Sequence, residues 1–138
     1  MRPLAIPLLL LTLAATALAG CNRPSFATPV EAYRSFHRHV QRGELAQAYE
    51  ALSTPTREQL AARSKALAEA SGGSVKDDPV ALFFTNVSRP ADVAEVTLER
   101  EQGDAATLRV VSSGTRRTVR MVREPSGWRV DLSQALKP

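Results

Sequence analysis

The chain has very little sulfur and few aromatic side chains. Its 138 residues include one cysteine, Cys21, two methionines, two histidines, four phenylalanines, two tyrosines and one tryptophan. A single cysteine excludes an internal disulfide and a cysteine-rich metal site, so the fold must rest on its own packing. A basic stripe interleaved with aromatic residues is also missing, which argues against nucleic-acid binding. Nothing in the composition predicts a metal or a cofactor.

The longest apolar run lies at the start of the chain and is too short to span a membrane. Met1-Arg2 precedes Leu4–Leu18, which one proline and two threonines interrupt. A spanning helix needs about 20 apolar residues. A charged start, a short apolar stretch and small residues at Ala19-Gly20 are typical of a signal peptide. Residues 1–20 are therefore predicted to be a signal peptide.

The only cysteine follows this segment directly, in Leu18-Ala19-Gly20-Cys21. This stretch resembles the lipobox of bacterial lipoproteins. The resemblance implies a diacylglyceryl group on the Cys21 sulfur, cleavage before Cys21 and acylation of the freed amine. Two or more acyl chains, at ~0.8 kcal/mol per buried methylene, anchor a protein stably where one does not. The alternative is an ordinary secreted protein in which Cys21 is incidental.

The residues that follow the cysteine suggest where such an anchor sits. Asn22, rather than an aspartate, resembles the pattern of lipoproteins sent to the outer membrane, where the domain would face the periplasm. Residues 21–27 are expected to form a tether without periodicity, with a reach on the order of 20 Å. Residues 28–138 suffice for one domain. After removal of residues 1–20, 17 basic and 14 acidic side chains remain, which indicates a solvated surface of mixed charge.

Helical signals dominate the first half of the domain. Thr28-Pro29-Val30-Glu31 is typical of a capped helix start, and Gly43 of a helix end. Between them an apolar stripe recurs at helical spacing, namely Val30, Tyr33, Phe36, His37 and Val40. A shorter helix is expected to carry the stripe Leu45, Ala48, Tyr49 and Leu52.

Ser53-Thr54-Pro55 repeats the cap-then-proline signal and predicts a third helix that runs to about Ala70. Its apolar face is thin, which predicts a place on the outside of the packing; the face consists of Leu60, Ala61, Leu67 and Ala68. Periodicity leaves Val80–Phe84 open between helix and strand, and the preceding Asp78-Pro79 favours one or two helical turns.

After Pro90 the hydrophobic period changes to two, and turn residues separate four short segments. This predicts an α+β fold in which N-terminal helices pack on a curved, four-stranded antiparallel meander at the C-terminus. The residues expected on the inner face are all apolar: Ala94, Val96, Leu98, Ala106, Leu108, Val110, Val119, Met121, Trp128, Val130 and Leu132. Charged residues, among them Glu95, Glu99, Arg109, Arg120 and Asp131, are expected on the outer face.

Three stretches carry a further resemblance: residues 28–33, residues 43–49 and the C-terminal segment Arg123–Asp131, which contains Gly127-Trp128. Together with the helix-then-meander order they resemble small lipoproteins with a nuclear-transport-factor-two-like, or cystatin-like, domain. The resemblance implies a cone-like fold in which the curved sheet wraps around the N-terminal helices. Some enzymes of that fold, such as ketosteroid isomerases, hold an Asp or an Asp-His pair inside the cone as a general base.

Side chains that could line such a cone are Tyr33, Phe36, His37, Tyr49, Met121 and Trp128. His37 lies at the edge of the first apolar stripe and His39 near its other border. Neither histidine has an acidic partner at helical spacing, and because they point about 200° apart they cannot share a metal ion locally. Trp128 is expected to fill the core.

These patterns favour a non-enzymatic, lipid-anchored protein of the bacterial cell envelope. Its domain would bind an envelope partner or a small apolar ligand, or serve structurally, and the lipid on Cys21 would hold it at the membrane. The rival hypothesis is an acid–base enzyme that uses His37 with Tyr33 or Tyr49. Such a base requires a desolvated position in a pocket.

The anchor hypothesis predicts the behaviour of Cys21→Ser. This change removes the only thiol that can be acylated, so the variant should lose its lipid and leave the membrane fraction while its domain stays folded. Fractionation with a high-salt wash, together with the intact mass, measures this. If the variant remains with the membranes after the wash, the anchor assignment is wrong.

Overall fold

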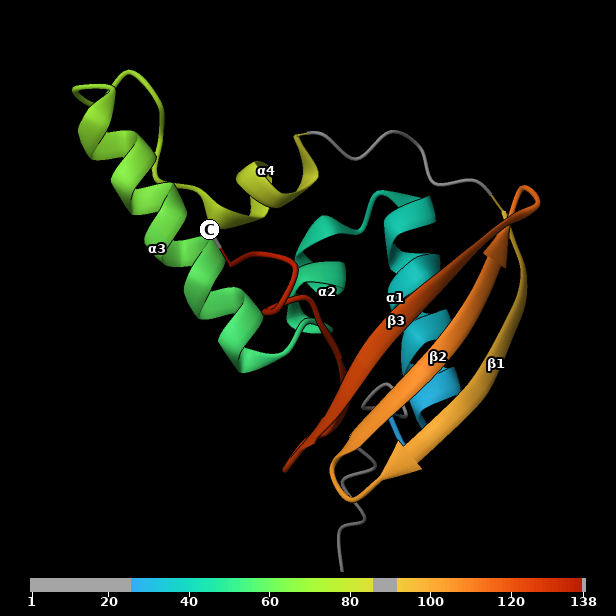
Figure 1. Ribbon diagram of the computed structural model, residues 1–138. Coiled ribbons are helices and arrows are strands. Elements are labelled where there is room, and N and C mark those ends of the chain that lie inside the picture. The colour runs from blue at the N-terminus through green and yellow to red at the C-terminus, as the bar shows by residue number, and fades with distance from the viewer. Residues whose placement is uncertain (1–25, 86–91, 138) are drawn as a thin grey trace, which may run out of the picture.

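The chain forms helices followed by an antiparallel meander, an α+β fold as predicted (Figure 1). The computed structural model describes residues 26–85 and 92–137; the expected signal peptide and Cys21 lie outside them. The helices within these residues are α1 (Pro29–Arg42), α2 (Leu45–Glu50), α3 (Thr54–Ala70) and α4 (Pro79–Phe84). The strands are β1 (Val93–Gln102), β2 (Ala105–Ser112), β3 (Thr115–Glu124) and β4 (Gly127–Asp131), paired in the order β1-β2-β3-β4.

The helix starts follow the predicted capping residues. The hydroxyl of Thr28 accepts a hydrogen bond from the Glu31 backbone N–H, and Gly43 ends α1 in the left-handed conformation with φ 70°. Ser53 caps α3 in the same way. Side-chain caps satisfy backbone N–H groups that have no partner inside the helix.

The segment left open between helix and strand is helical. The Asp78 carboxylate accepts a hydrogen bond of 2.9 Å from the Ala81 backbone N–H, and α4 covers Val80–Phe84. The helical turns that Asp78-Pro79 favoured are therefore confirmed, although the apolar run alone did not distinguish helix from strand.

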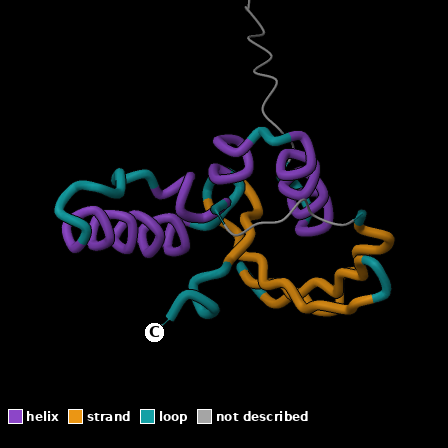
Figure 2. Tube along the Cα trace, turned by 90° about the horizontal axis from the view of Figure 1, so that it is seen from above, coloured by secondary structure: helices purple, strands orange, loops and turns teal. Residues whose placement is uncertain are grey.

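The sheet curves around α1, which contacts β1, β2 and β4 (Figures 1 and 2). The buried apolar residues form one cluster between helices and sheet: Ala32, Leu52, Leu60, Val96, Ala106, Leu108, Val110, Met121, Trp128 and Val130. Trp128 is only 2% exposed and Met121 is fully buried, so both fill the core. The expectation for Trp128 is confirmed.

The inner face of β1 departs from the prediction. Ala94, expected on the inner face, is exposed, and Leu98 lies on that face opposite buried Leu108 but is 40% exposed. The register of β1 against β2 shifts between Val93 and Glu95 and again between Leu98 and Arg100. Because a bulge reverses the alternation beyond it, Glu101 lies opposite buried Ala106, on the inner side at the end of the sheet.

The helices also bury faces that differ from the predicted stripes. In α1 the buried residues are Pro29, Ala32 and Ser35, whereas Tyr33 and Phe36 are half-buried. Small side chains allow the helix to approach the sheet closely. In α2, Ala48 is buried as predicted but Leu45 is 36% exposed.

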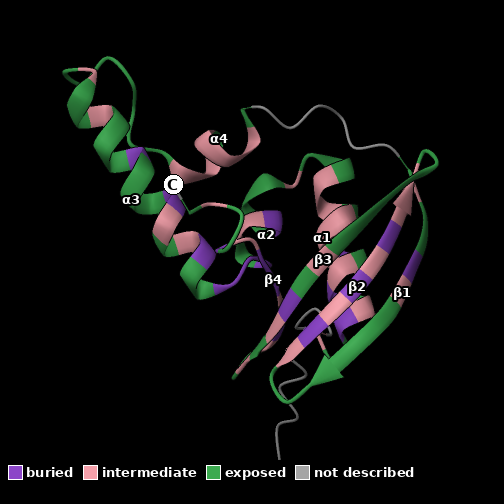
Figure 3. Cartoon of the chain, in the orientation of Figure 1, coloured by how far each residue is buried: buried purple, intermediate pink, exposed green. Residues whose placement is uncertain are grey.

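Helix α3 lies on the outside, as its thin apolar face predicted. It extends away from the sheet beside α4, and its far half is largely exposed (Figure 3). Leu60 is buried, but Leu67 is 43% exposed. Ser64 is the last buried residue of this helix, and its hydroxyl donates to the Asp77 carboxylate at 2.6 Å.

The outer edge of β4 is covered by two segments from the helical half. Val130 N–H donates to Ala51 C=O at 2.9 Å, and Ser53 N–H donates to Val130 C=O at 2.8 Å. Trp128 N–H donates to Phe26 C=O at 3.0 Å. A Cβ atom on Gly127, whose φ is +116°, would lie 2.6 Å from the Phe26 Cβ, so only glycine permits this approach.

Asp131 is the main correction to the outer face. Its carboxylate pairs with Arg120 at 3.0 Å, but the residue is 7% exposed instead of solvated. The start of α3 covers it: Oδ1 accepts hydrogen bonds from the Ser53 hydroxyl at 2.9 Å and the Thr56 hydroxyl at 3.2 Å. Ser133 N–H donates to the same oxygen at 3.2 Å. The carboxylate thus joins α3 to both C-terminal strands.

These hydrogen bonds determine the protonation of Asp131. Burial by itself would raise the pKa of its carboxyl, but hydrogen bonds from Ser133, Ser53 and Thr56 outweigh burial and hold the pKa below its ordinary value. A carboxyl whose pKa is lower in the folded state contributes stability above its unfolded pKa, about 3.9. That contribution is lost as the pH falls through the folded pKa.

The burial of Trp128 predicts a large loss of stability for Trp128→Ala. Removing a buried aromatic side chain leaves a cavity and should cost ~3–5 kcal/mol in the free energy of unfolding, measured by urea denaturation. Leu67→Ala, at an exposed apolar position, is the control and should cost less than about 1 kcal/mol. A loss below about 1 kcal/mol for Trp128→Ala would contradict its place in the core.

The buried carboxylate predicts a pH-dependent effect for Asp131→Asn. At neutral pH the variant should be less stable by about 1–3 kcal/mol, because charge-assisted hydrogen bonds to the carboxylate are lost. The difference should shrink as the pH falls below about 4, because the carboxyl of the unfolded chain, which has the higher pKa, is protonated first and the unfolded wild type gains stability relative to the folded one. Urea denaturation between pH 3 and 7 measures it, with exposed Asp104→Asn as the control. A difference that stays constant over this range would contradict the assignment.

Candidate functional site

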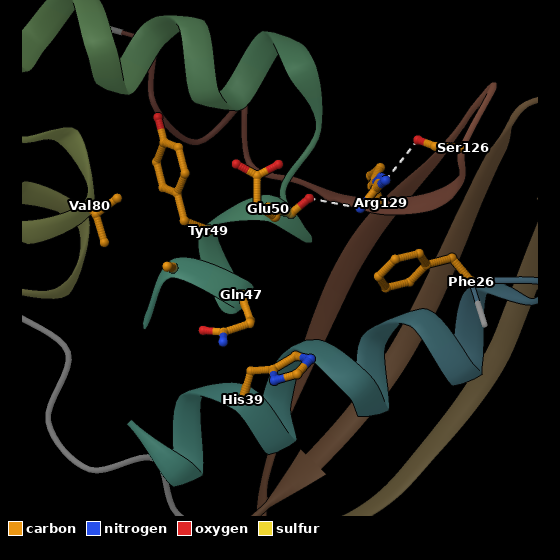
Figure 4. Close-up of a pocket in the computed structure, with 9 residues that line it drawn as sticks. Phe26, His39, Gln47, Tyr49, Glu50, Val80, Ser126 and Arg129 are labelled. Carbon is orange, nitrogen blue, oxygen red and sulfur yellow. Dashed lines mark hydrogen bonds between the residues drawn. The ribbon is translucent and has the colours of Figure 1, made fainter. Parts of the chain in front are cut away.

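Two clefts flank α1, one on each side. The larger, which we call the α2 cleft, has a volume of about 540 Å³ and lies between α1, α2, α4 and the β3–β4 turn (Figure 4). The smaller, the β1 cleft, has a volume of about 380 Å³ and lies between α1 and β1. Both are open to solvent.

Apolar side chains from separate elements meet in the α2 cleft. Phe26 precedes α1, Ala46 and Tyr49 come from α2, and Val80 comes from α4. The cleft is open to solvent, with these apolar side chains in its wall.

Arg129 is the cation at one side of the α2 cleft. One Nη donates to the Glu50 C=O and the other to the Ser126 hydroxyl, both at 2.7 Å. The guanidinium stacks on the Phe26 ring, 4.5 Å from its centroid. Burial lowers the pKa of Arg129, against the opposing effect of Glu124. In the described part of the chain, no carboxylate forms an ion pair with Arg129.

The other charged groups around the α2 cleft have partners of their own. Glu50 pairs with Arg57 at 2.9 Å. His39 lies 2.5 Å from the carboxylate of Glu44, a pairing that the sequence analysis missed because it crosses the end of α1. The Glu124 carboxylate accepts hydrogen bonds from the backbone N–H and the hydroxyl of Thr54, at 2.7 and 3.2 Å.

The β1 cleft contains His37 and Tyr33, whose rings stack with centroids 6.3 Å apart. Burial lowers the pKa of His37, with Asp92 opposing the shift, and burial raises the pKa of Tyr33. The His37 Nε2 atom is buried without a hydrogen-bond partner in residues 26–85 and 92–137. A neutral imidazole can accept a proton, but within those residues no hydrogen bond to a carboxylate orients it.

The predicted site residues are thus divided among three places. Tyr33 and His37 share the β1 cleft, whereas Tyr49 lines the α2 cleft, where its hydroxyl donates to the Arg57 C=O at 3.2 Å. Phe36 is half-buried against the core, which also holds Met121 and Trp128. Of the two rival acid–base pairs, only His37 with Tyr33 lies in one cleft.

Sequence reasoning missed the two residues that define the α2 cleft. Phe26 was placed in a tether without periodicity, yet its carbonyl pairs with β4. An aromatic residue two positions before a helix cap was the available signal. Arg129 was not singled out, because its position directly after Gly127-Trp128 does not reveal its stacking partner.

Comparison with models of protein families, with curated proteins and with solved structures gives no significant match. In residues 26–85 and 92–137, no helix is long and apolar enough to cross a membrane, and no group of three or more His, Cys, Asp or Glu side chains is placed to hold a metal ion.

Proposed function

We propose that the protein is a lipid-anchored, non-catalytic protein of the bacterial cell envelope whose domain binds a small apolar ligand in the α2 cleft. The lipobox resemblance at Cys21 supports the anchor, and the outer membrane, facing the periplasm, is the proposed location. The observation that carries the binding role is the apolar wall of the α2 cleft. Its volume of about 540 Å³ lies within the range of roughly 300–1,000 Å³ typical of small-molecule sites.

The physical gain for such a ligand is the removal of apolar surface from water, at about 25 cal/mol per Å². Phe26, Tyr49 and Val80 provide that surface on the protein side. A lipophilic ligand could pass directly from the membrane to the cleft. Only residues 22–25 separate Cys21 from Phe26, so the cleft lies within on the order of 20 Å of the lipidated residue.

The non-catalytic part of the proposal rests on the polar groups. Around the α2 cleft, His39 is paired with Glu44 and Glu50 with Arg57. In the β1 cleft, His37 and Tyr33 stack instead of forming a hydrogen-bonded acid–base pair.

A photoreactive monoacylglycerol tests the binding role in envelope membranes that contain the full-length lipidated protein. After illumination, trypsin releases residues 43–57, which carry Ala46 and Tyr49, and mass spectrometry measures their labelling. Ala46→Phe places a ring in the cleft from an exposed helical position and should lower this labelling several-fold. Ala61→Phe, an exposed position on α3, is the matched control and should not. Equal labelling of the two variants would contradict the proposal.

A further inference from the structure

Among residues 26–85 and 92–137, the carboxylates near the α2 cleft have ion-pair or hydrogen-bond partners, whereas Arg129 has no carboxylate partner. Glu50 pairs with Arg57, Glu44 with His39, and Glu124 with the first turn of α3. Arg129 is held instead by two neutral oxygen atoms, the Glu50 C=O and the Ser126 hydroxyl. These bonds fix the guanidinium plane and use one N–H of each Nη, so a second N–H on each remains.

The guanidinium of Arg129, fixed in position with N–H groups to spare, is preorganised to bind an anion. It has already lost part of its hydration, because Phe26 covers one face and the residue is half-buried. An arriving carboxylate or phosphate would gain charge-assisted hydrogen bonds without ordering the side chain anew. The cleft beside it is apolar, with Phe26, Ala46, Tyr49 and Val80 in its wall. A charged head and an apolar body therefore each have a complementary surface.

The volume of the α2 cleft matches a ligand whose apolar part is a single acyl chain. A methylene group occupies roughly the volume of a water molecule in the liquid, ~30 Å³. A cleft of about 540 Å³ then corresponds to on the order of a dozen and a half methylene groups, the size of one acyl chain. Single-chain lipids also leave a bilayer reversibly, whereas two-chain lipids are held firmly.

We infer that the α2 cleft binds a single-chain amphiphile with an anionic head group, with the head on Arg129 and the chain along Phe26, Tyr49 and Val80. This inference rests on the proposed function, because it specifies the ligand of the same cleft. The shared chemistry covers two sources, a free fatty acid with a carboxylate head and a lysophospholipid with a phosphate head.

Three photoreactive probes with the same acyl chain separate these possibilities in membranes that contain the full-length protein. They are a fatty acid, lysophosphatidylglycerol and the neutral monoacylglycerol. Labelling of residues 43–57 should be about tenfold stronger for at least one anionic probe than for the neutral probe. Whichever anionic probe labels more strongly identifies the head group. Equal labelling by all three probes would overturn the inference while leaving the binding role of the cleft intact.

Variants of Arg129 test the residue itself. Arg129→Gln should abolish the preference for the anionic probe and leave neutral-probe labelling unchanged, whereas Arg116→Gln, an exposed arginine of β3, should retain the preference. If Arg129→Gln also loses neutral-probe labelling, the substitution has changed the cleft itself, and Arg129→Lys is then the deciding variant. A preference for the anionic probe that persists with lysine supports the inference. Loss of that preference overturns it. Loss of labelling by every probe in the wild type would instead defeat the proposed function.

Discussion

One buried carboxylate joins the helical half of the chain to its sheet. Asp131 ends β4 and accepts hydrogen bonds from Ser53 and Thr56, which begin α3, and from Arg120 on β3. A buried charge is costly unless hydrogen bonds satisfy it, so this arrangement allows only one position for the start of α3. The same stretch, Ala51–Ser53, pairs with Val130 along the edge of β4. The directions of α2 and α3, and with them the walls of the α2 cleft, depend on this junction.

The sequence predicted those features that depend on neighbouring residues. Helix starts at Thr28 and Ser53, and the end of α1 at Gly43, follow from local hydrogen bonds and backbone preferences. The order of the four strands follows from alternation and turn residues. These signals act within a few positions, so they can be interpreted without knowledge of the tertiary structure.

Features that depend on contacts between distant segments were not predictable in the same way. Alternation assigned Asp131 to a solvated face, because the pattern cannot show that α3 returns to cover it. It placed Leu98 correctly on the inner face, opposite buried Leu108, but it could not show that this residue of edge strand β1 stays 40% exposed. Tyr33 and Tyr49 were candidates for one site, yet the path of the chain from α1 into α2 places them in separate clefts.

Phe26 links the proposed anchor to the proposed binding site. Its carbonyl pairs with Trp128, its approach requires Gly127, and its ring supports Arg129. Phe26 therefore joins the stretch before α1 to β4 and lies in the wall of the α2 cleft. A longer tether would allow the domain to rotate freely above the bilayer, but residues 22–25 reach only on the order of 15 Å. If Cys21 carries the lipid, the cleft must stay close to the membrane surface, where single-chain amphiphiles are most concentrated. The contact of Phe26 with β4 would then also determine which molecules reach the cleft.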